Sequence, residues 1–343
     1  MEYKISIILP VYNGENDLNK SINSLIKQTI GFENIELIIV DDNSSDNSKK
    51  LIDKYSEKYQ NIKTIFLDNN SGTAGKPRNI GVAHSSSNFI MFIDQDDEYL
   101  EDACNLFYEK IKNNDVDLVI ANTIEIRPKC EIKSKFKYNN SIIKVNINEN
   151  PEFIYFAYSG AMWNKIFKKD IINTNDIKCL ENGLSEDTFF VYEYYLNTKQ
   201  ILYLPKYYGY KHYLFRDNGK SLTENSSTSF ISIKFKSMDE NIQMINCYEN
   251  SKKFCQNVLN HFADAILALI SLSNNPKNDK ITLFKDYYDL NKKYGFYIKN
   301  NNYALKILNY LILNKKFNLS YILSIFLKYL SFVRDMAYNI INE

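Results

Sequence analysis

The chain lacks the features of disulfide-rich, zinc-binding and membrane-spanning proteins. Five cysteines in 343 residues are an odd number, and no C-x-x-C pair occurs. This argues against a disulfide framework and against structural zinc. No stretch reaches the ~20 uninterrupted apolar residues of a membrane span. The net charge is only +1, so a general affinity for nucleic acid is not indicated. The cysteines are Cys104, Cys130, Cys179, Cys247 and Cys255.

The sequence also shows no signal peptide, because Met1-Glu2-Tyr3-Lys4 leads directly into a strand-like segment. We therefore expect a cytoplasmic protein. Charge is unevenly distributed. Residues 230–343 contain 15 Lys and Arg against 9 Asp and Glu, whereas the remainder contains 27 against 32. An acidic front part suits a cation-dependent site, and a basic tail suits an anionic partner or surface.

Strands and helices alternate in the first part of the chain. Apolar runs predict strands at 5–9, 36–40, 63–67, 88–93 and 117–121, the first one stopping at Pro10. Helical spacing of apolar residues predicts helices at 18–26 and 46–59. This alternation indicates an α/β fold with a doubly wound, mixed and mostly parallel sheet. Long helical patterns follow, including 258–272, 304–313 and 319–336. We expect a catalytic domain over 1–225 (halves 1–122 and 123–225) and a helical domain over 226–343.

Four polar clusters follow the predicted strands. In such sheets ligands bind beyond the carboxyl ends of the strands, so we expect the four clusters to converge on one edge. The clusters are Pro10–Asn13, Asp41–Ser44, Asn69–Arg78 and Asp94–Asp97.

The fourth cluster stands in the segment FIDQDD, Phe92–Asp97. An apolar run leads directly into three carboxylates, which repel one another unless a positive group lies between them. Such oxygen-rich clusters suit Mg²⁺ or Mn²⁺, and these ions usually accompany a phosphate-bearing substrate. A solvated acidic turn is the alternative for this segment taken alone.

Five motifs in this order resemble the family 2 glycosyltransferases, which have the GT-A fold. The resemblance covers roughly the first two thirds of the chain. The third motif is most similar to a loop of wall teichoic acid glycosyltransferases and related surface-polymer enzymes. The motifs are SIILPVYNGE (Ser6–Glu15), IIVDDNSSD (Ile38–Asp46), NNSGTAGKPRNIG (Asn69–Gly81), FIDQDD (Phe92–Asp97) and SEDTFF (Ser185–Phe190).

The resemblance implies a nucleotide-diphosphate sugar as donor, most often a UDP-sugar. Asp42 matches the aspartate that binds uracil, and Pro10 and Tyr12 would form the wall of the base pocket. Without the motif, Pro10 is a strand stop and Tyr12 a buried aromatic residue. Asn70 belongs to a glycine-containing loop able to approach a ligand closely. Arg78 offers a cation for phosphate or for anchoring that loop, and a surface turn with a solvated arginine is the alternative.

FIDQDD corresponds to the D-x-D motif of the family. Asp96 matches the carboxylate that binds the metal, and Asp94 matches the one that contacts ribose or metal. The implied cofactor is Mn²⁺ or Mg²⁺ bound together with the diphosphate oxygens. We expect a structural role for Asp97, such as capping a following helix.

SEDTFF corresponds to the motif that supplies the base. Asp187 matches the family's base for an inverting displacement, in which the acceptor hydroxyl loses a proton as it attacks. Glu186 would help to position the acceptor. The alternative is that the acidic pair only begins a helix with Ser185 as its cap; both can hold.

Acceptor contacts are assigned to four further residues. Trp163, the only tryptophan, lies where related enzymes build the acceptor floor, and a core tryptophan is the alternative. Lys165 is assigned a phosphate contact. His212 and Arg216 belong to a segment that closes over the donor in relatives, so they are candidates for touching metal or diphosphate. A packed or solvated position is the alternative for both.

We therefore expect an inverting UDP-sugar glycosyltransferase acting on a cell-surface glycan or polyol-phosphate polymer. Two alternatives are a nucleotidyltransferase and a catalytically inactive sugar-nucleotide-binding or scaffold protein. The apolar pattern of the C-terminal helices favours an interpretation in which they pack on the catalytic domain or between subunits of a homo-oligomer. Peripheral association with the inner face of an anionic membrane is the alternative.

Overall fold

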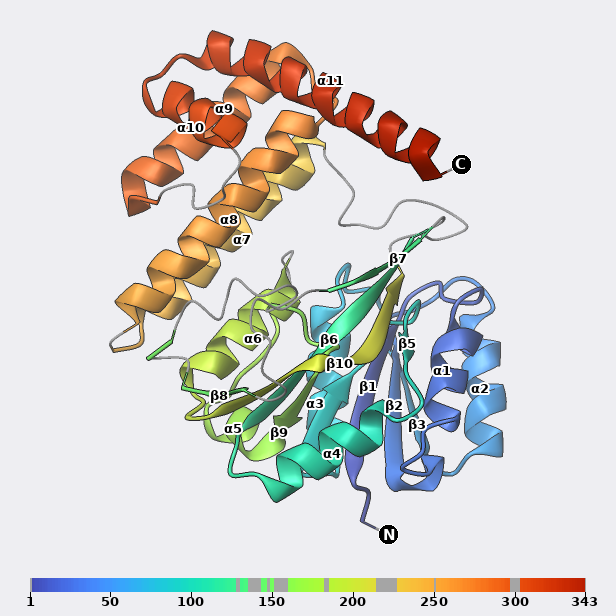
Figure 1. Cartoon of the computed structure of the whole chain (residues 1–343). Coiled ribbons are helices and arrows are strands. Elements are labelled where there is room, and N and C mark those ends of the chain that lie inside the picture. Colours follow the sequence, from blue (N-terminus) through green and yellow to red (C-terminus); the bar gives the residue numbers. More distant parts are fainter. Residues whose placement is uncertain are drawn as a thin grey trace. The chain divides into compact units, whose positions relative to one another are not determined.

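The first part of the chain folds around one ten-stranded sheet in the computed structural model of the protein (Figure 1). The structure describes residues 2–127, 130–134, 143–146, 149–150, 160–181, 185–213, 227–249, 251–296 and 303–342. For Ile143, His261 and residues 330–342 it describes only the backbone. The strands are β1 (Ile5–Val11), β2 (Ile35–Asp41), β3 (Ile62–Phe66), β4 (Phe89–Phe92), β5 (Glu98–Tyr99), β6 (Leu118–Arg127), β7 (Cys130–Lys133), β8 (Ile143–Val145), β9 (Lys165–Lys168) and β10 (Ile201–Tyr213).

The sheet is mixed. Its described strands follow the order β3-β2-β1-β4-β9-β6-β10-β5, with β7 beside β6 and β8 beside β10. Strands β1, β2, β3, β4, β6 and β10 run in one direction, and the other four run against them. The five strands predicted from the sequence are all present in the sheet, as β1, β2, β3, β4 and β6.

Helices cover both faces of the sheet. On one face, Ile7 and Leu9 of β1 join a core cluster with α1 (Leu18–Ile26) and α4 (Ala103–Asn113). On the other face, Ile8 packs against Gly81 of α3 (Gly75–His84), where an added Cβ would lie 2.5 Å from Ile8 Cγ2. The other helices of this part are α2 (Ser48–Lys58), α5 (Lys169–Thr174), α6 (Glu186–Leu196) and a short 3-10 turn at Phe32–Asn34.

Strand β1 continues through Pro10, which the sequence had predicted to end it. Strand β4 pairs with β1 only as far as Ile8, whereas the pairing with β2 extends to Val11. Beyond Ile8 one side of β1 therefore has no neighbouring strand, and a residue without an N–H group is tolerated there.

The chain divides into two compact units, Met1–Ser221 and Leu222–Glu343. The described part of the second unit is helical, as predicted, with the helices that the sequence indicated near 258–272, 304–313 and 319–336. The predicted boundary after residue 225 lies outside the described residues. Among the described residues, no helix is long and apolar enough to cross a membrane. The helices are α7 (Thr228–Asn246), α8 (Lys252–Leu272), α9 (Lys277–Tyr294), α10 (Tyr303–Leu313) and α11 (Phe317–Asn342).

A fully buried carboxylate, Glu36 of β2, connects its strand with β1, with β3 and with the residues that follow α3. It accepts hydrogen bonds from Ser6 Oγ, from Ser86 N at 2.7 Å and from Ser86 Oγ at 2.8 Å, and Lys63 Nζ lies 2.5 Å away. Burial alone would raise the pKa of Glu36, but these partners outweigh burial and hold the pKa below its usual value.

We expect Glu36→Gln to lower the free energy of unfolding at pH 7 by about 1.5–3 kcal/mol, because hydrogen bonds to a charged group are lost. The folded-state pKa of Glu36 lies below the unfolded value, which is about 4.3. The stabilising contribution is thus present above that pH and is lost as pH falls through the folded pKa. The thermal unfolding curves of the wild type and of Glu36→Gln should differ at pH 7 and converge in acid. Glu33→Gln, at an exposed carboxylate nearby, is the control, and an equal loss in both variants would contradict the assignment.

Candidate active site

Segments that follow β1, β2 and β4 meet at one edge of the sheet. The backbone of Tyr12 pairs with the side-chain amide of Gln95, with Tyr12 N donating to Oε1 at 2.9 Å and Nε2 donating to Tyr12 O at 3.1 Å. Asn13 N donates to Ser44 Oγ at 2.9 Å. Three of the four polar clusters are thereby joined, as parallel strands require.

The remaining cluster, Asn69–Arg78, is held by Asp42, the residue that follows β2. Its carboxylate accepts hydrogen bonds from Ser71 N at 2.9 and 3.0 Å, from Ser71 Oγ at 2.8 Å and from Asn70 Nδ2 at 3.1 Å. Asp42 is buried, and Tyr12 is half exposed. Asp42 and Asn70 are thus brought together, and in this arrangement the carboxylate anchors the loop.

The predicted loop over Asn69–Gly81 ends earlier than expected, because α3 begins at Gly75. Pro77 is tolerated since N–H groups in the first turn of a helix have no partner within it. Asn79 in this helix pairs with the backbone of Cys179, donating to Cys179 O at 2.9 Å and accepting from Cys179 N at 2.8 Å. An added Cβ at Gly75 would collide with Leu180 O. Helix α3 thereby fixes the segment that leads toward α6.

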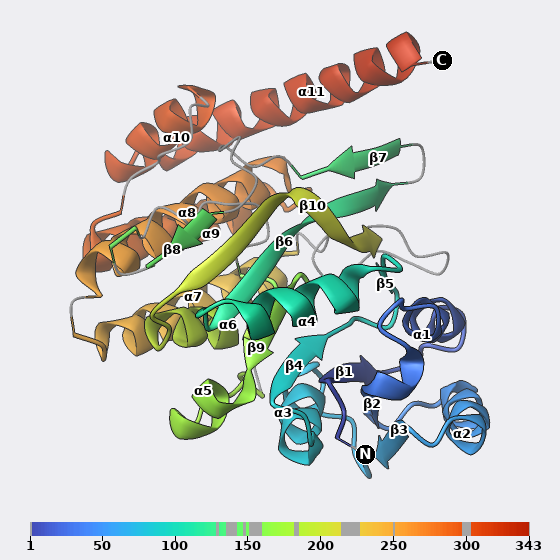
Figure 2. The ribbon, with the colours of Figure 1, turned by 60° about the horizontal axis from the view of Figure 1, so that its bottom comes forward.

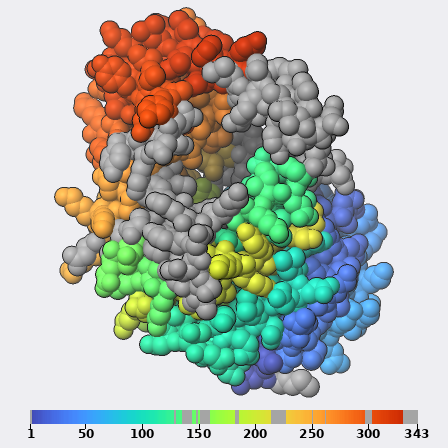
Figure 3. Space-filling view, in the orientation of Figure 1, coloured from blue at the N-terminus to red at the C-terminus, as the bar shows by residue number. Residues whose placement is uncertain are grey.

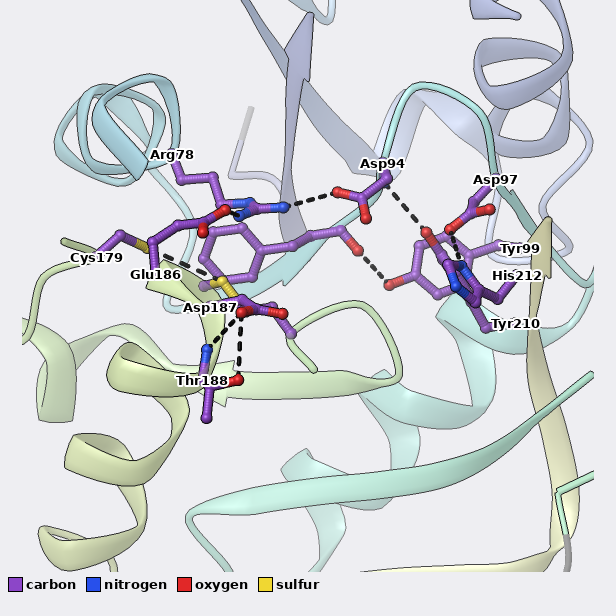
Figure 4. Close-up of polar contacts among 12 residues, drawn as sticks. Arg78, Asp94, Asp97, Tyr99, Cys179, Glu186, Asp187, Thr188, Tyr210 and His212 are labelled. Carbon is purple, nitrogen blue, oxygen red and sulfur yellow. Dashed lines mark hydrogen bonds and ion pairs between the residues drawn. The ribbon is translucent and has the colours of Figure 1, made fainter. Parts of the chain in front are cut away.

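Arg78 joins two acidic groups from different elements (Figure 4). Its Nη2 lies 2.8 Å from Asp94 Oδ1 and its Nη1 lies 2.7 Å from Glu186 Oε1. Its Nε has no hydrogen-bond partner in the described part of the chain, and the residue is 6% exposed. Burial alone would lower the pKa of Arg78, but Asp94 and Glu186 raise it above the usual value. The guanidinium is a permanent buried charge that holds both carboxylates.

The acidic pair Glu186 and Asp187 forms the first turn of α6. Asp187 Oδ1 accepts hydrogen bonds from Thr188 N at 2.7 Å and from Thr188 Oγ1 at 3.3 Å. Burial raises the pKa of Glu186 and the nearby charge of Asp187 raises it further, against Arg78, which lowers it. Ser185 stands at the N-cap position with φ 66°, and its side chain makes no capping hydrogen bond. Ser185 therefore stands at the position that the alternative gave it, but its side chain does not cap the helix.

Asp97 is structural, but it caps no helix. A strand, β5, follows it, and α4 begins after Asp102. Asp97 Oδ2 instead lies 3.0 Å from His212 Nδ1, and Oδ1 accepts from Tyr213 N at 2.8 Å. Burial raises the pKa of Asp97, while His212 lowers it. Burial alone would lower the pKa of His212, but the contact with Asp97 outweighs burial, and the pKa of His212 lies above its usual value. His212 thus lies next to FIDQDD, as Figure 4 shows.

Trp163 lies in the core and is 6% exposed. Its ring stacks on Tyr210, with centroids 4.7 Å apart, and on His212, at 5.0 Å. These surroundings match the alternative of a core tryptophan. Lys165 requires a correction, since it is fully buried in β9 and its Nζ donates to Ala161 O and to Asn164 Oδ1 at 2.7 Å. A phosphate contact from this position is wrong.

Arg216 lies outside the described residues. Among the described residues, no group of three or more His, Cys, Asp and Glu side chains could hold a metal ion. Asp94 and Asp96 offer hard oxygen ligands, but two carboxylates are too few to hold a metal ion without other ligands. They fit a Mg²⁺ or Mn²⁺ ion that takes its other ligands from water and a diphosphate.

Sequence reasoning missed the residues that hold the site together. Gln95 pairs with Tyr12, the hydroxyl of Tyr210 accepts a hydrogen bond from Asp94 N at 3.1 Å, and Cys179 is held by Asn79. Gln95 stands inside FIDQDD and could have been noticed there. The other two are more than 95 residues from their partners, and no local pattern marks such pairs.

Comparison with known proteins points to the same family as the motifs do. Residues 6–169 match the family model described as "Glycosyl transferase family 2". The poly(ribitol-phosphate) beta-N-acetylglucosaminyltransferase TarP of Staphylococcus aureus (strain N315) is 34% identical over 200 residues, which are 57% of this chain and 58% of TarP. A poly(ribitol-phosphate) beta-glucosyltransferase of Bacillus spizizenii is 31% identical over 64% of this chain and 33% of its own length. The chain thus spans between a third and three fifths of these relatives.

The fold is confirmed by a solved structure. The crystal structure of S. aureus TarS 1–349 in complex with UDP-GlcNAc matches with a TM-score of 0.71 and 22% identity, over 94% of this chain and 90% of that chain. The predicted α/β architecture with a helical C-terminal region is therefore correct.

Proposed function

We propose that the chain, whose residues 6–169 match the family model described as "Glycosyl transferase family 2", transfers a sugar from a UDP-sugar to a hydroxyl of a polyol-phosphate polymer, with inversion. The donor is suggested by the UDP-GlcNAc bound to TarS. The acceptor is suggested by the poly(ribitol-phosphate) named for TarP and the Bacillus spizizenii enzyme. The cytoplasmic location and the homo-oligomer expected from the sequence remain predictions.

One observation carries the proposal. Arg78 binds Asp94, at the end of β4, and Glu186, at the start of α6, at 2.8 and 2.7 Å. Asp94 of the D-x-D motif and Glu186, the neighbour of Asp187, are therefore separated by no more than the reach of one guanidinium. An inverting transfer needs this proximity, because the departing diphosphate and the attacking hydroxyl lie on opposite sides of one sugar carbon.

The donor would be held at the edge where Tyr12 and Asp42 lie. Tyr12 exposes about half of its side chain and offers a flat surface for the base. Asp42 would accept a hydrogen bond from the base N–H, in exchange for some of its bonds to Ser71. Pro10 and Asn70 flank this place, and Asp94 would contact the ribose.

The acceptor hydroxyl would be deprotonated by Asp187. Its Oδ1 is fixed by Thr188, so the carboxylate has a defined orientation while it takes the proton. Glu186, held by Arg78, would orient the acceptor. A Mg²⁺ or Mn²⁺ ion bound by Asp96 and Asp94 would supply Lewis-acid stabilisation of the departing diphosphate.

We expect UDP release from one member of a UDP-sugar panel, in the presence of Mn²⁺ and a poly(ribitol-phosphate) acceptor. EDTA should lower the rate by at least about a hundredfold, since a metal that stabilises charge on the diphosphate contributes several kcal/mol. Asp96→Asn should show the same loss and little response to added Mn²⁺. Asp102→Asn, at an exposed carboxylate just before α4 that accepts a hydrogen bond from the Tyr207 hydroxyl, is the matched control.

Other outcomes would identify the alternatives. Binding of a UDP-sugar without any release of UDP would indicate an inactive binding protein. Release of pyrophosphate from a nucleoside triphosphate would indicate a nucleotidyltransferase. Full activity in EDTA would remove the metal from the proposal.

A further inference from the structure

Helix α11 exposes its large apolar residues and buries small polar ones. Leu319, Ile322, Phe326 and Tyr329 recur at spacings of three and four, and together with Ile325 they fall within about 120° of arc at 3.6 residues per turn. Ser320 and Ser324, on the opposite side, are fully buried. The exposed fractions of the five apolar side chains lie between 49% and 63%.

Helix α10 repeats the arrangement. Tyr303, Ile307 and Tyr310 are exposed at 81%, 54% and 66%, whereas Leu305, Leu308 and Ile312 on the opposite side are buried. The two helices are joined by residues 314–316 and lie side by side in both ribbon views (Figures 1 and 2). Their orange and red atoms reach the surface in Figure 3. We call the eight exposed side chains the apolar face: Tyr303, Ile307, Tyr310, Leu319, Ile322, Ile325, Phe326 and Tyr329.

An apolar face of this kind is unusual for a water-exposed helix. A helix that is apolar on both sides, as α10 is, is normally buried or in contact with lipid. Soluble monomers rarely expose contiguous apolar patches beyond a few hundred Å² without a partner. Isoleucine, leucine and phenylalanine gain nothing from contact with a hydrophilic polyol-phosphate chain, so the acceptor is not a suitable occupant.

Charge determines the kind of partner. Residues 303–329 contain four lysines, Lys306, Lys315, Lys316 and Lys328, and no Asp or Glu. Lys306 borders the apolar arc of α10, and Lys315 and Lys316 are exposed between the two helices. Lys328 borders the arc of α11 and hydrogen-bonds Asn274. A second copy of the chain would bring the same cations face to face in a twofold contact, which is unfavourable, whereas an anionic surface complements them.

We propose that the apolar face docks peripherally on an anionic phospholipid surface, with α10 and α11 lying in the plane of the headgroups. The apolar side chains enter the boundary between headgroups and acyl chains, the tyrosines lie at headgroup level, and the lysines contact the lipid phosphates. The arrangement is independent of the sugar-transfer proposal, because none of these residues is assigned to the catalytic site.

Sedimentation with vesicles tests the proposal. The full chain should bind vesicles of phosphatidylglycerol and phosphatidylcholine in equal parts, and bind pure phosphatidylcholine at least tenfold more weakly. The double variant Ile322→Ser/Phe326→Ser should lose at least about tenfold in partitioning, because two apolar side chains no longer leave water. Lys315→Gln/Lys316→Gln should lose about fivefold for each lysine.

Matched controls use exposed residues of the same unit outside the face. Ile233→Ser/Leu272→Ser removes two exposed apolar side chains from α7 and α8, and Lys252→Gln/Lys253→Gln removes an adjacent exposed lysine pair. Both should bind like the wild type, and circular dichroism should show all variants folded. Equal binding to both vesicles, or no effect of Ile322→Ser/Phe326→Ser, would overturn the proposal. An oligomer that Ile322→Ser/Phe326→Ser dissociates, without vesicle binding, would identify the face as an interface between copies and overturn it as well.

Discussion

Replacement of Asp187 by asparagine is expected to lower the rate of sugar transfer by about 10²- to 10⁴-fold, the usual contribution of a general base. The substitution keeps the side-chain shape. An asparagine Oδ1 can still accept the hydrogen bonds from Thr188 N and Oγ1 that orient the native carboxylate. What it loses is the ability to take a proton. The measurement is UDP release with saturating acceptor, together with the dissociation constant of the UDP-sugar, which should stay within about threefold of the wild type.

Two comparisons sharpen this experiment. Asp170→Asn changes an exposed carboxylate in the first turn of α5 and should leave transfer unchanged. Glu186→Gln weakens the contact with Arg78 but keeps Asp187, so it should raise the KM for acceptor more than it lowers kcat. If Asp187→Asn transfers sugar at the wild-type rate while Glu186→Gln does not, Glu186 is the base.

The local elements of the fold could be predicted because their signals are local. Apolar residues recur at helical spacing over 18–26, and α1 has those bounds. The buried run before FIDQDD becomes β4 in the centre of the sheet. Pro10 misled the prediction because its effect depends on which strand lies on each side, and this is decided by β4, about 80 residues later.

The connections within the site could not be predicted, since they join distant segments. Arg78 and Glu186 are 108 residues apart, and Asp97 and His212 are 115 apart. The motifs indicated which side chains carry chemistry, but no periodicity states which cation meets which carboxylate. Lys165 failed for a similar reason. Its strand, β9, is inserted between β4 and β6. The residues next to Lys165 in the sequence give no sign that its side chain is buried there.

The second large effect is expected at Arg78. Arg78→Met keeps an unbranched apolar stem and removes the guanidinium, so Asp94 and Glu186 lose the cation between them. Breaking a buried ion pair from one side typically costs about 3–5 kcal/mol of unfolding free energy. We also expect transfer to fall by at least about a hundredfold, because small displacements of catalytic groups cost that much. Lys178→Met is the control, since the ion pair of Lys178 with Asp176 is exposed and worth at most about 1 kcal/mol.

A double-mutant cycle separates a positioning role from simple loss of stability. Arg78→Met/Glu186→Gln removes one of the two charges that Arg78→Met leaves uncompensated, so part of the lost stability, about 1–3 kcal/mol of coupling, should return in chemical unfolding. Activity should not return with it, because Asp94 is still without its cation and the acceptor side has lost its ordered carboxylate. If activity recovers in parallel with stability, Arg78 acts only through the fold. If neither stability nor activity differs among the variants of the cycle, the ion pairs of Arg78 contribute to neither. Arg78 would then not be the residue that assembles the site.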